Sequence, residues 1–166
     1  GVPRAHQGRR ERDRVSRIAA LADAVVAYLV AKPLTPPAGV TMSIERSYFF
    51  PVRPEDVAAE CKVYVFPAPA RVAELEGRRT LRDQITVQVG VTRKLTGNGQ
   101  LTNANVDPMM ALMDRIIDLL TRAEVSPDAR WIATTQDPTL DYAALQQQSV
   151  FISLVSVTYQ MEAEID

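Results

Sequence analysis

Hydrophobic residues recur at helical and strand spacings along most of the chain. Over 16–32 they return every three or four residues, which predicts an amphipathic helix that begins after a capping serine. Over 40–50, 61–66 and 84–95 apolar and polar residues alternate, which predicts three half-buried strands. The stretch 149–161 is apolar on both faces, so it predicts a strand inside a sheet or one covered by a partner.

A second helix is predicted after the third strand. Asp107 is suited to cap it and Pro108 fits its first position. A short strand around Trp131 and a brief helical turn after Pro138 complete the elements. Their order predicts an α+β fold, with one mostly antiparallel sheet of about four strands and two main helices packed on it. The buried stripe of the second helix is Met109, Leu112, Met113, Ile116, Ile117 and Leu120.

The segment 67–82 between the second and third strands is long and charged. A hairpin loop usually has two to five residues, so this excess predicts a projecting hairpin or a solvated loop. Charges of both signs with apolar residues between them suit contact with protein, because the apolar groups supply buried area and the charges set register. We therefore expect an arm that contacts a neighbouring subunit through Arg71, Val72, Glu74, Leu75, Glu76, Arg78, Arg79, Leu81 and Arg82.

Residues 1–14 form a second distinctive segment, because they are basic and carry few bulky apolar groups. We expect an extended arm that packs either on its own domain or on another chain, and a single domain over 15–166. The candidate partner-binding residues of this arm are Arg4, Arg9, Arg10, Arg12 and Arg14.

Composition excludes several classes of protein. The formal net charge is -1, which is unlike a dedicated nucleic-acid binder. The 14-residue arm carries +3, so the remaining residues carry -4. One cysteine and one histidine cannot form an intramolecular disulfide or a usual zinc site. Apolar runs are too short or interrupted to span a bilayer, so we expect no membrane partner. The composition, with its single cysteine, fits a protein made in a reducing compartment.

The search for catalytic chemistry yields only weak candidates. His6 lies in the basic arm, and Cys61 begins a strand where it suits a small core residue. The glycines at 97 and 99 predict a turn, since the helix start and third glycine of a dinucleotide site are missing. Glu55, Asp56 and Glu60 suit the start of a helical turn better than a metal site. We expect no enzyme activity, cofactor or metal.

The order of motifs resembles one protein family. The segments SIERSYFFPV, CKVYVFPAPA, QITVQVGVTRKL and ARWIATTQDPTLDYAALQQQSVFISLVSVTY follow the first helix in the order seen in the tail terminator and neck proteins of tailed bacteriophages. The resemblance spans roughly residues 15–160, and its most specific parts are the strand ending in QVGVTRKL and the late segment running into an apolar strand.

The resemblance implies a structural virion protein. Such proteins form a ring, typically a hexamer, at the head-proximal end of the tail tube, where they stop tube polymerisation and join the head. It implies that the partners are further copies of the chain, a tail tube protein and a head-side connector protein. Genome DNA passes through the channel, and assembly takes place in the host cytoplasm. In that family the excursion matching 67–82 packs on neighbours after assembly. Two alternatives stay open, another neck component such as a head-completion or stopper protein, and a small binding module.

Overall fold

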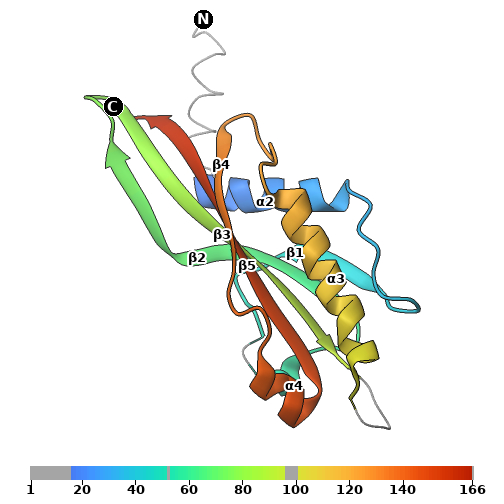
Figure 1. Ribbon diagram of the computed structural model, residues 1–166. Coiled ribbons are helices and arrows are strands. Elements are labelled where there is room, and N and C mark those ends of the chain that lie inside the picture. The colour runs from blue at the N-terminus through green and yellow to red at the C-terminus, as the bar shows by residue number, and fades with distance from the viewer. Residues whose placement is uncertain (1–15, 52, 96–100, 166) are drawn as a thin grey trace, which may run out of the picture.

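The computed structural model describes residues 16–51, 53–95 and 101–165. Its centre is one five-stranded sheet with strand order β1-β2-β3-β5-β4 (Figure 1). The strands are β1 (Met42–Arg46), β2 (Cys61–Leu75), β3 (Thr80–Lys94), β4 (Ala129–Gln136) and β5 (Val150–Glu164). The helices are α2 (Arg17–Val30), α3 (Asn103–Leu120) and α4 (Tyr142–Gln148), with a 3-10 turn η1 (Pro54–Asp56).

The predicted α+β class is confirmed; the short strand predicted around Trp131 is β4, and the helical turn predicted after Pro138 is α4. Only the β1–β2 pair is parallel, and the other three pairs are antiparallel. β5 lies between β3 and β4, as the apolar residues on both of its faces predict. β3 and β5 pair along their whole lengths, from Thr80 with Glu164 to Lys94 with Val150.

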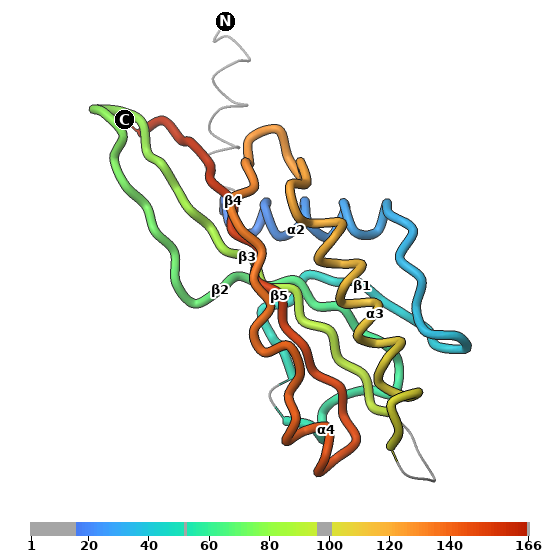
Figure 2. The backbone as a smooth tube through the Cα atoms, viewed as in Figure 1, coloured from blue at the N-terminus to red at the C-terminus, as the bar shows by residue number. Residues whose placement is uncertain are grey.

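Helices α2 and α3 pack on one face of the sheet and bury a single core (Figure 2). The stripe Leu21, Val25 and Leu29 of α2 meets alternate valines of β2 and β3, all close to fully buried. Ser16 caps α2 as predicted, because its hydroxyl accepts a hydrogen bond from the Ala19 N–H at 3.3 Å. We call this the helix face and the opposite one the open face.

Helix α3 begins earlier than its proline suggested. The prediction that Asp107 caps it was wrong, because Thr102 and Asn105 form the cap and Pro108 lies inside the helix. The Asn105 side-chain oxygen accepts hydrogen bonds from the Thr102 N–H at 2.9 Å and from its hydroxyl at 3.0 Å. Pro108 is the sixth residue of α3, so the hydrogen bond that a backbone N–H at this position would donate to the Ala104 carbonyl is absent.

Strand β1 is shorter than the alternation over 40–50 predicted. It ends at Arg46, because the Ser47 hydroxyl exchanges hydrogen bonds with the backbone N–H and C=O of Phe49, both at 3.1 Å. This serine turn redirects the chain. Tyr48 is therefore 59% exposed and Phe49 85% exposed, although a strand that continued the alternation over 40–50 would place Tyr48 on its apolar face.

Phe50 continues from this turn onto the open face of the sheet. Its ring stacks on Phe66 at 5.2 Å between centroids and meets Tyr64 edge-on at 5.7 Å. It lies directly over Gly90, where a β-carbon would come within 2.3 Å of the ring. A smaller apolar cluster of Phe50, Val57, Ala144, Val150 and Ile152 covers this part of the open face.

Strand β5 extends further than the predicted end at 161. Beyond it, Glu162, Ala163 and Glu164 pair with β3, and the two glutamates are exposed. Their partners are Arg82, Leu81 and Thr80, which belong to the charged segment 67–82. The backbone of the two segments is thus held in one sheet.

Candidate subunit interface

The charged segment 67–82 folds as the outer part of a long hairpin. β2 and β3 continue beyond the helices, and β5 joins them as a third strand (Figure 1). We call this projection the arm and define it as 70–85 with 160–165. The hairpin prediction is confirmed, whereas the third strand was not foreseen. Three paired strands hold the arm extended better than a two-stranded ribbon could.

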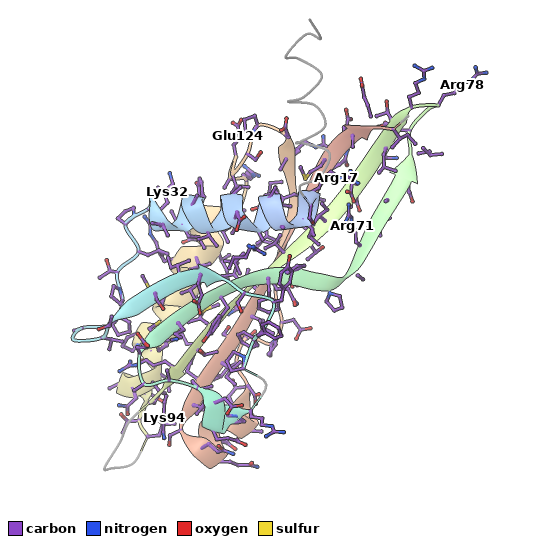
Figure 3. The ribbon with its side chains drawn as sticks, turned by 180° about the vertical axis from the view of Figure 1, so that it is seen from behind. Arg17, Lys32, Arg71, Arg78, Lys94 and Glu124 are labelled. Atoms are coloured by element: carbon purple, nitrogen blue, oxygen red, sulfur yellow. The ribbon has the colours of Figure 1, made fainter. Side chains whose placement is uncertain are left out.

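The predicted contact residues are distributed over both strands and the turn of the arm. Arg71, Val72, Glu74 and Leu75 lie on β2, and Leu81 and Arg82 lie on β3. Glu76, Arg78 and Arg79 lie in the turn, and Figure 3 shows Arg78 at the tip of the arm. All but Leu81 and Arg82 are exposed, and those two are half-buried. Their role in subunit contact remains a prediction.

The turn at the tip depends on Gly77. Its φ of +88° lies in the left-handed region, which a residue with a β-carbon adopts only with strain. The Glu76 N–H donates to the Thr80 carbonyl at 2.8 Å and closes the turn. The two arginines that follow the glycine are held at the end of the hairpin.

The two faces of the arm differ in polarity. Because directly paired residues share a face, the register places Leu75, Leu81, Ala163 and Ile165 on the helix face. Leu75 is 64% exposed there, since α2 ends before it reaches this part of the sheet. The open face of the arm is mostly polar, with Val72 as its apolar exception and Glu74, Arg82, Gln84, Gln160 and Glu162 around it.

At the base of the arm a buried carboxylate joins three elements. Asp83 is fully buried on the helix face. Its oxygens accept hydrogen bonds from Arg71 Nε at 2.8 Å, from Arg71 Nη2, and from Arg17 Nε at 3.0 Å. Figure 3 shows Arg17 at the end of α2 and Arg71 on β2, both at the base of the arm. The cluster therefore fastens the arm to the first helix.

The arginines decide the charge state of Asp83. Burial alone would raise the pKa of the carboxyl, but the hydrogen bonds from Arg71 and Arg17 outweigh burial and hold it below the usual value. The hydrogen bond to Asp83 raises the pKa of Arg71 in turn. Arg71 was predicted as a contact residue, and it has this structural role within its own chain.

The outer edge of β2 is protected unevenly. β1 pairs with β2 only as far as Val65, and beyond it no described strand covers that edge. Pro67 and Pro69 lack a backbone N–H and so discourage pairing along the first part. From 70 to 75 the edge contains no proline, and its outward backbone groups are available to another chain.

Several predicted sites fall outside the described residues. These are the basic arm 1–14, the turn at 97–99, and the arm residues Arg4, His6, Arg9, Arg10, Arg12 and Arg14.

The candidate catalytic and metal-binding residues within the described ranges lie in surroundings that suit a structural role. Cys61 is buried in the core, and that burial raises the pKa of its thiol to about 11 in spite of nearby Arg93. Glu55 and Asp56 lie in η1, as the predicted turn requires, and Glu60 pairs with Lys62 at 3.8 Å. Within the described ranges, no three acidic, cysteine or histidine side chains are placed to hold a metal ion. None of the described helices is both long and apolar enough to cross a membrane.

The sequence analysis did not predict two features of this surface, the burial of Asp83 and the exposure of Tyr48 and Phe49. Asp83 continues the inward alternation of Ile85 and Val87, so its burial could have been read from the period of β3. The exposure of Tyr48 and Phe49 depends on the turn at Ser47, which the apolar alternation conceals.

Comparison with known proteins yields structural likenesses only. No protein-family model matches the chain, and no curated protein matches it. One similar solved structure is a chain of the virion of a native gene transfer agent particle, at 13% identity and a TM-score of 0.45. The match covers 91% of this chain and all of that one.

A second similar structure is the sheath/tube terminator of an extracellular contractile injection system, PVC, in its extended state. Identity is 13% and the TM-score is 0.38, with 92% of this chain and 58% of that one covered. At such low identity and TM-score, neither likeness carries an argument about function.

Proposed function

We propose that this chain is a structural virion protein that forms a ring at the head-proximal end of a phage tail tube. In this proposal the ring is a hexamer, as the resemblance implies, and it stops tube polymerisation and joins the tail to the head. DNA passes through its channel without specific contacts. The protein acts without catalysis, in the virion, after assembly in the host cytoplasm.

The observation that carries the proposal is the arm. A monomeric protein gains little from a projecting three-stranded sheet whose helix face leaves Leu75 64% exposed and Ile165 36% exposed. An apolar surface of this kind is stabilised when a second chain covers it. The sequence resemblance to tail terminators independently assigns the same segment to contact between subunits.

Closed rings require heterologous contacts, in which one surface of a subunit meets a different surface of the next. An arm on one end of the molecule satisfies the first half of that requirement. The tail tube protein and the head-side connector would then bind the two faces of the ring, with the basic segment 1–14 as a further contact. A ring around DNA is compatible with the net charge of -4 outside that segment, since few phosphates would be held tightly.

Electron microscopy of the purified protein with and without tail tubes tests this proposal. We expect rings, and rings seated on one end of each tube. The control is a variant in which Asn-Gly replaces 77–79, so that Glu76 stays opposite Thr80 and the register of β2 and β3 is kept; it should fold and form no ring. Protein that stays monomeric and never binds tubes would refute the proposal.

Partial particles separate the two neck roles. A terminator stays on headless tails, whereas a stopper or head-completion protein stays on tailless heads. Immunogold labelling of both kinds of particle distinguishes them, and label only on tailless heads would favour the stopper.

A further inference from the structure

The aromatic turn 47–51 is an exposed apolar surface that the fold does not require. Tyr48 and Phe49 are among the most exposed large apolar side chains of the described residues, at 59% and 85%. Phe50 holds the turn in place by stacking on Phe66 and meeting Tyr64. Exposed neighbouring aromatic residues on a fixed base are typical of binding surfaces.

A hollow of about 410 Å³ lies beside these rings. Phe49, Phe50, Pro51, Arg53, Asp56 and Tyr64 line it. Its lining is mixed, since it combines aromatic rings with the charged side chains of Arg53 and Asp56. It has room for one aliphatic side chain and can place charges against the partner that carries it.

The chemistry of the arm tip complements this surface. Leu75 supplies an exposed aliphatic side chain, and Arg78 and Arg79 supply positive charge close to it. Glu55 and Asp56 supply negative charge beside the aromatic turn, and both are exposed. These four charges make no ion pair with another residue in the described ranges, so they are available for one between chains.

The arm cannot reach this surface in its own chain. Phe50 lies over Gly90, and Gly90 is ten residues along β3 from Thr80 at the arm tip. At roughly 3.3 Å per residue that separation is about 33 Å. The Ala58 carbonyl accepts a hydrogen bond from Lys94 N–H, which ties the segment after η1 to the far end of β3. Figure 3 shows Lys94 and Arg78 at opposite ends of the molecule.

We propose that the aromatic turn 47–51 and the adjacent η1 form the socket that receives the arm tip of a second copy of this chain. Leu75 enters the hollow beside Phe49, and Arg78 and Arg79 lie against Glu55 and Asp56. The contact joins one end of a subunit to a distant surface of the next, so it is heterologous, as a ring requires. This inference rests on the ring-forming function proposed above and identifies the two surfaces that meet.

Cysteine cross-linking tests the contact directly. Leu75→Cys and Phe49→Cys place one thiol on each surface, and native Cys61 is buried and does not compete. After mild oxidation of assembled rings, a mixture of the two single variants should give cross-linked dimers, and a chain with both changes should give a ladder of covalent oligomers. Each single variant alone should stay monomeric on a denaturing gel. The matched control is Val30→Cys, an exposed apolar position on α2, which should not cross-link with Leu75→Cys.

Charge reversal provides a second test that leaves the folded core untouched. Arg78→Glu with Arg79→Glu should weaken self-association roughly tenfold, because like charges then face each other. Glu55→Arg with Asp56→Arg in the same chain should restore it. Asp114→Arg with Asp118→Arg, on the exposed side of α3, should not.

The outcomes separate this contact from the ring itself. If wild-type rings form but Leu75→Cys cross-links with itself, or the mixture gives no dimer, the socket is elsewhere and the ring proposal stands. If the wild-type chain assembles with neither itself nor tubes, both proposals fail.

Discussion

The buried carboxylate of Asp83 predicts how the arm is fastened to the rest of the protein. Asp83→Asn keeps the shape of the side chain but removes its charge. The amide oxygen can still accept a hydrogen bond from one arginine. Its NH₂ group, however, faces a second guanidinium donor, so at least one of the hydrogen bonds from Arg71 and Arg17 is lost.

The expected loss of stability follows from burial and exposure together. A hydrogen bond to a charged group contributes about 1.5–3 kcal/mol, and breaking a fully buried ion pair costs about 3–5 kcal/mol. The carboxyl of Asp83 is fully buried, but the side chains of Arg17 and Arg71 are 41% and 35% exposed and regain water when released. We therefore expect Asp83→Asn to lower the free energy of unfolding by about 2–3 kcal/mol at pH 7.

The lowered pKa of Asp83 also predicts how the stability difference between wild type and Asp83→Asn changes with pH. Because the folded chain lowers the pKa of Asp83, the carboxylate stabilises the fold above the pKa of an unfolded aspartate, about 3.9. That contribution is lost as the pH falls through the lower pKa of the folded state. The difference between wild type and Asp83→Asn should therefore be largest near neutral pH and shrink below about pH 4.

Urea unfolding followed by the fluorescence of Trp131, the single tryptophan, measures both effects. Protein concentration is kept low enough for the chain to be monomeric, since assembly adds stability. The control Asp114→Asn alters an exposed carboxylate on α3 and should change the free energy of unfolding by less than about 0.5 kcal/mol. If Asp83→Asn behaves like that control at pH 7, Asp83 does not fasten the arm as described.

Three further predictions concern other parts of the fold. Gly90→Ala should displace the ring of Phe50, because the new methyl would lie 2.3 Å from it; we expect a loss of about 1–3 kcal/mol in urea unfolding and stronger binding of an apolar dye such as ANS, and no change in either would contradict the close approach of the ring. Asn105→Ala removes the acceptor for Thr102 at the start of α3 and should cost about 1 kcal/mol, whereas an unchanged unfolding midpoint would show that the cap does not stabilise the helix. The Cys61 thiol, with a pKa of about 11, should not react with a disulfide reagent such as DTNB at pH 8 until the protein unfolds, and rapid reaction of the native protein would contradict its burial.

Hydrophobic periodicity correctly predicted the elements that bury one continuous apolar face. The stripe of α2 and the alternating valines of β3 each bury one face, so spacing alone locates them. The predicted ends of elements were wrong where a local signal, a proline or a polar side chain, conflicted with that spacing. Pro108 suggested a helix start, but the Thr102 and Asn105 cap begins α3 earlier, and Ser47 ends β1 before the alternation does.

The third strand of the arm could not be predicted in this way. Glu162 and Glu164 are charged, and their place in the sheet depends on pairing with Arg82 and Thr80, which lie far away in sequence. Single-residue preferences contain no information about such a partner. The hairpin itself was predictable, since the excess length between two clear strands leaves few other compact arrangements.

The arm is completed by β5, which is the last strand of the sheet to be synthesised. The β2–β3 hairpin leaves the ribosome well before β5, yet β5 is the strand that completes the arm and supplies Ala163 and Ile165 to its apolar face. Until β5 is synthesised, one side of β3 has no partner strand and the apolar face of the arm is incomplete. On the function proposed above, the surface that would meet a neighbouring subunit is therefore complete only once the last strand of the chain has been made.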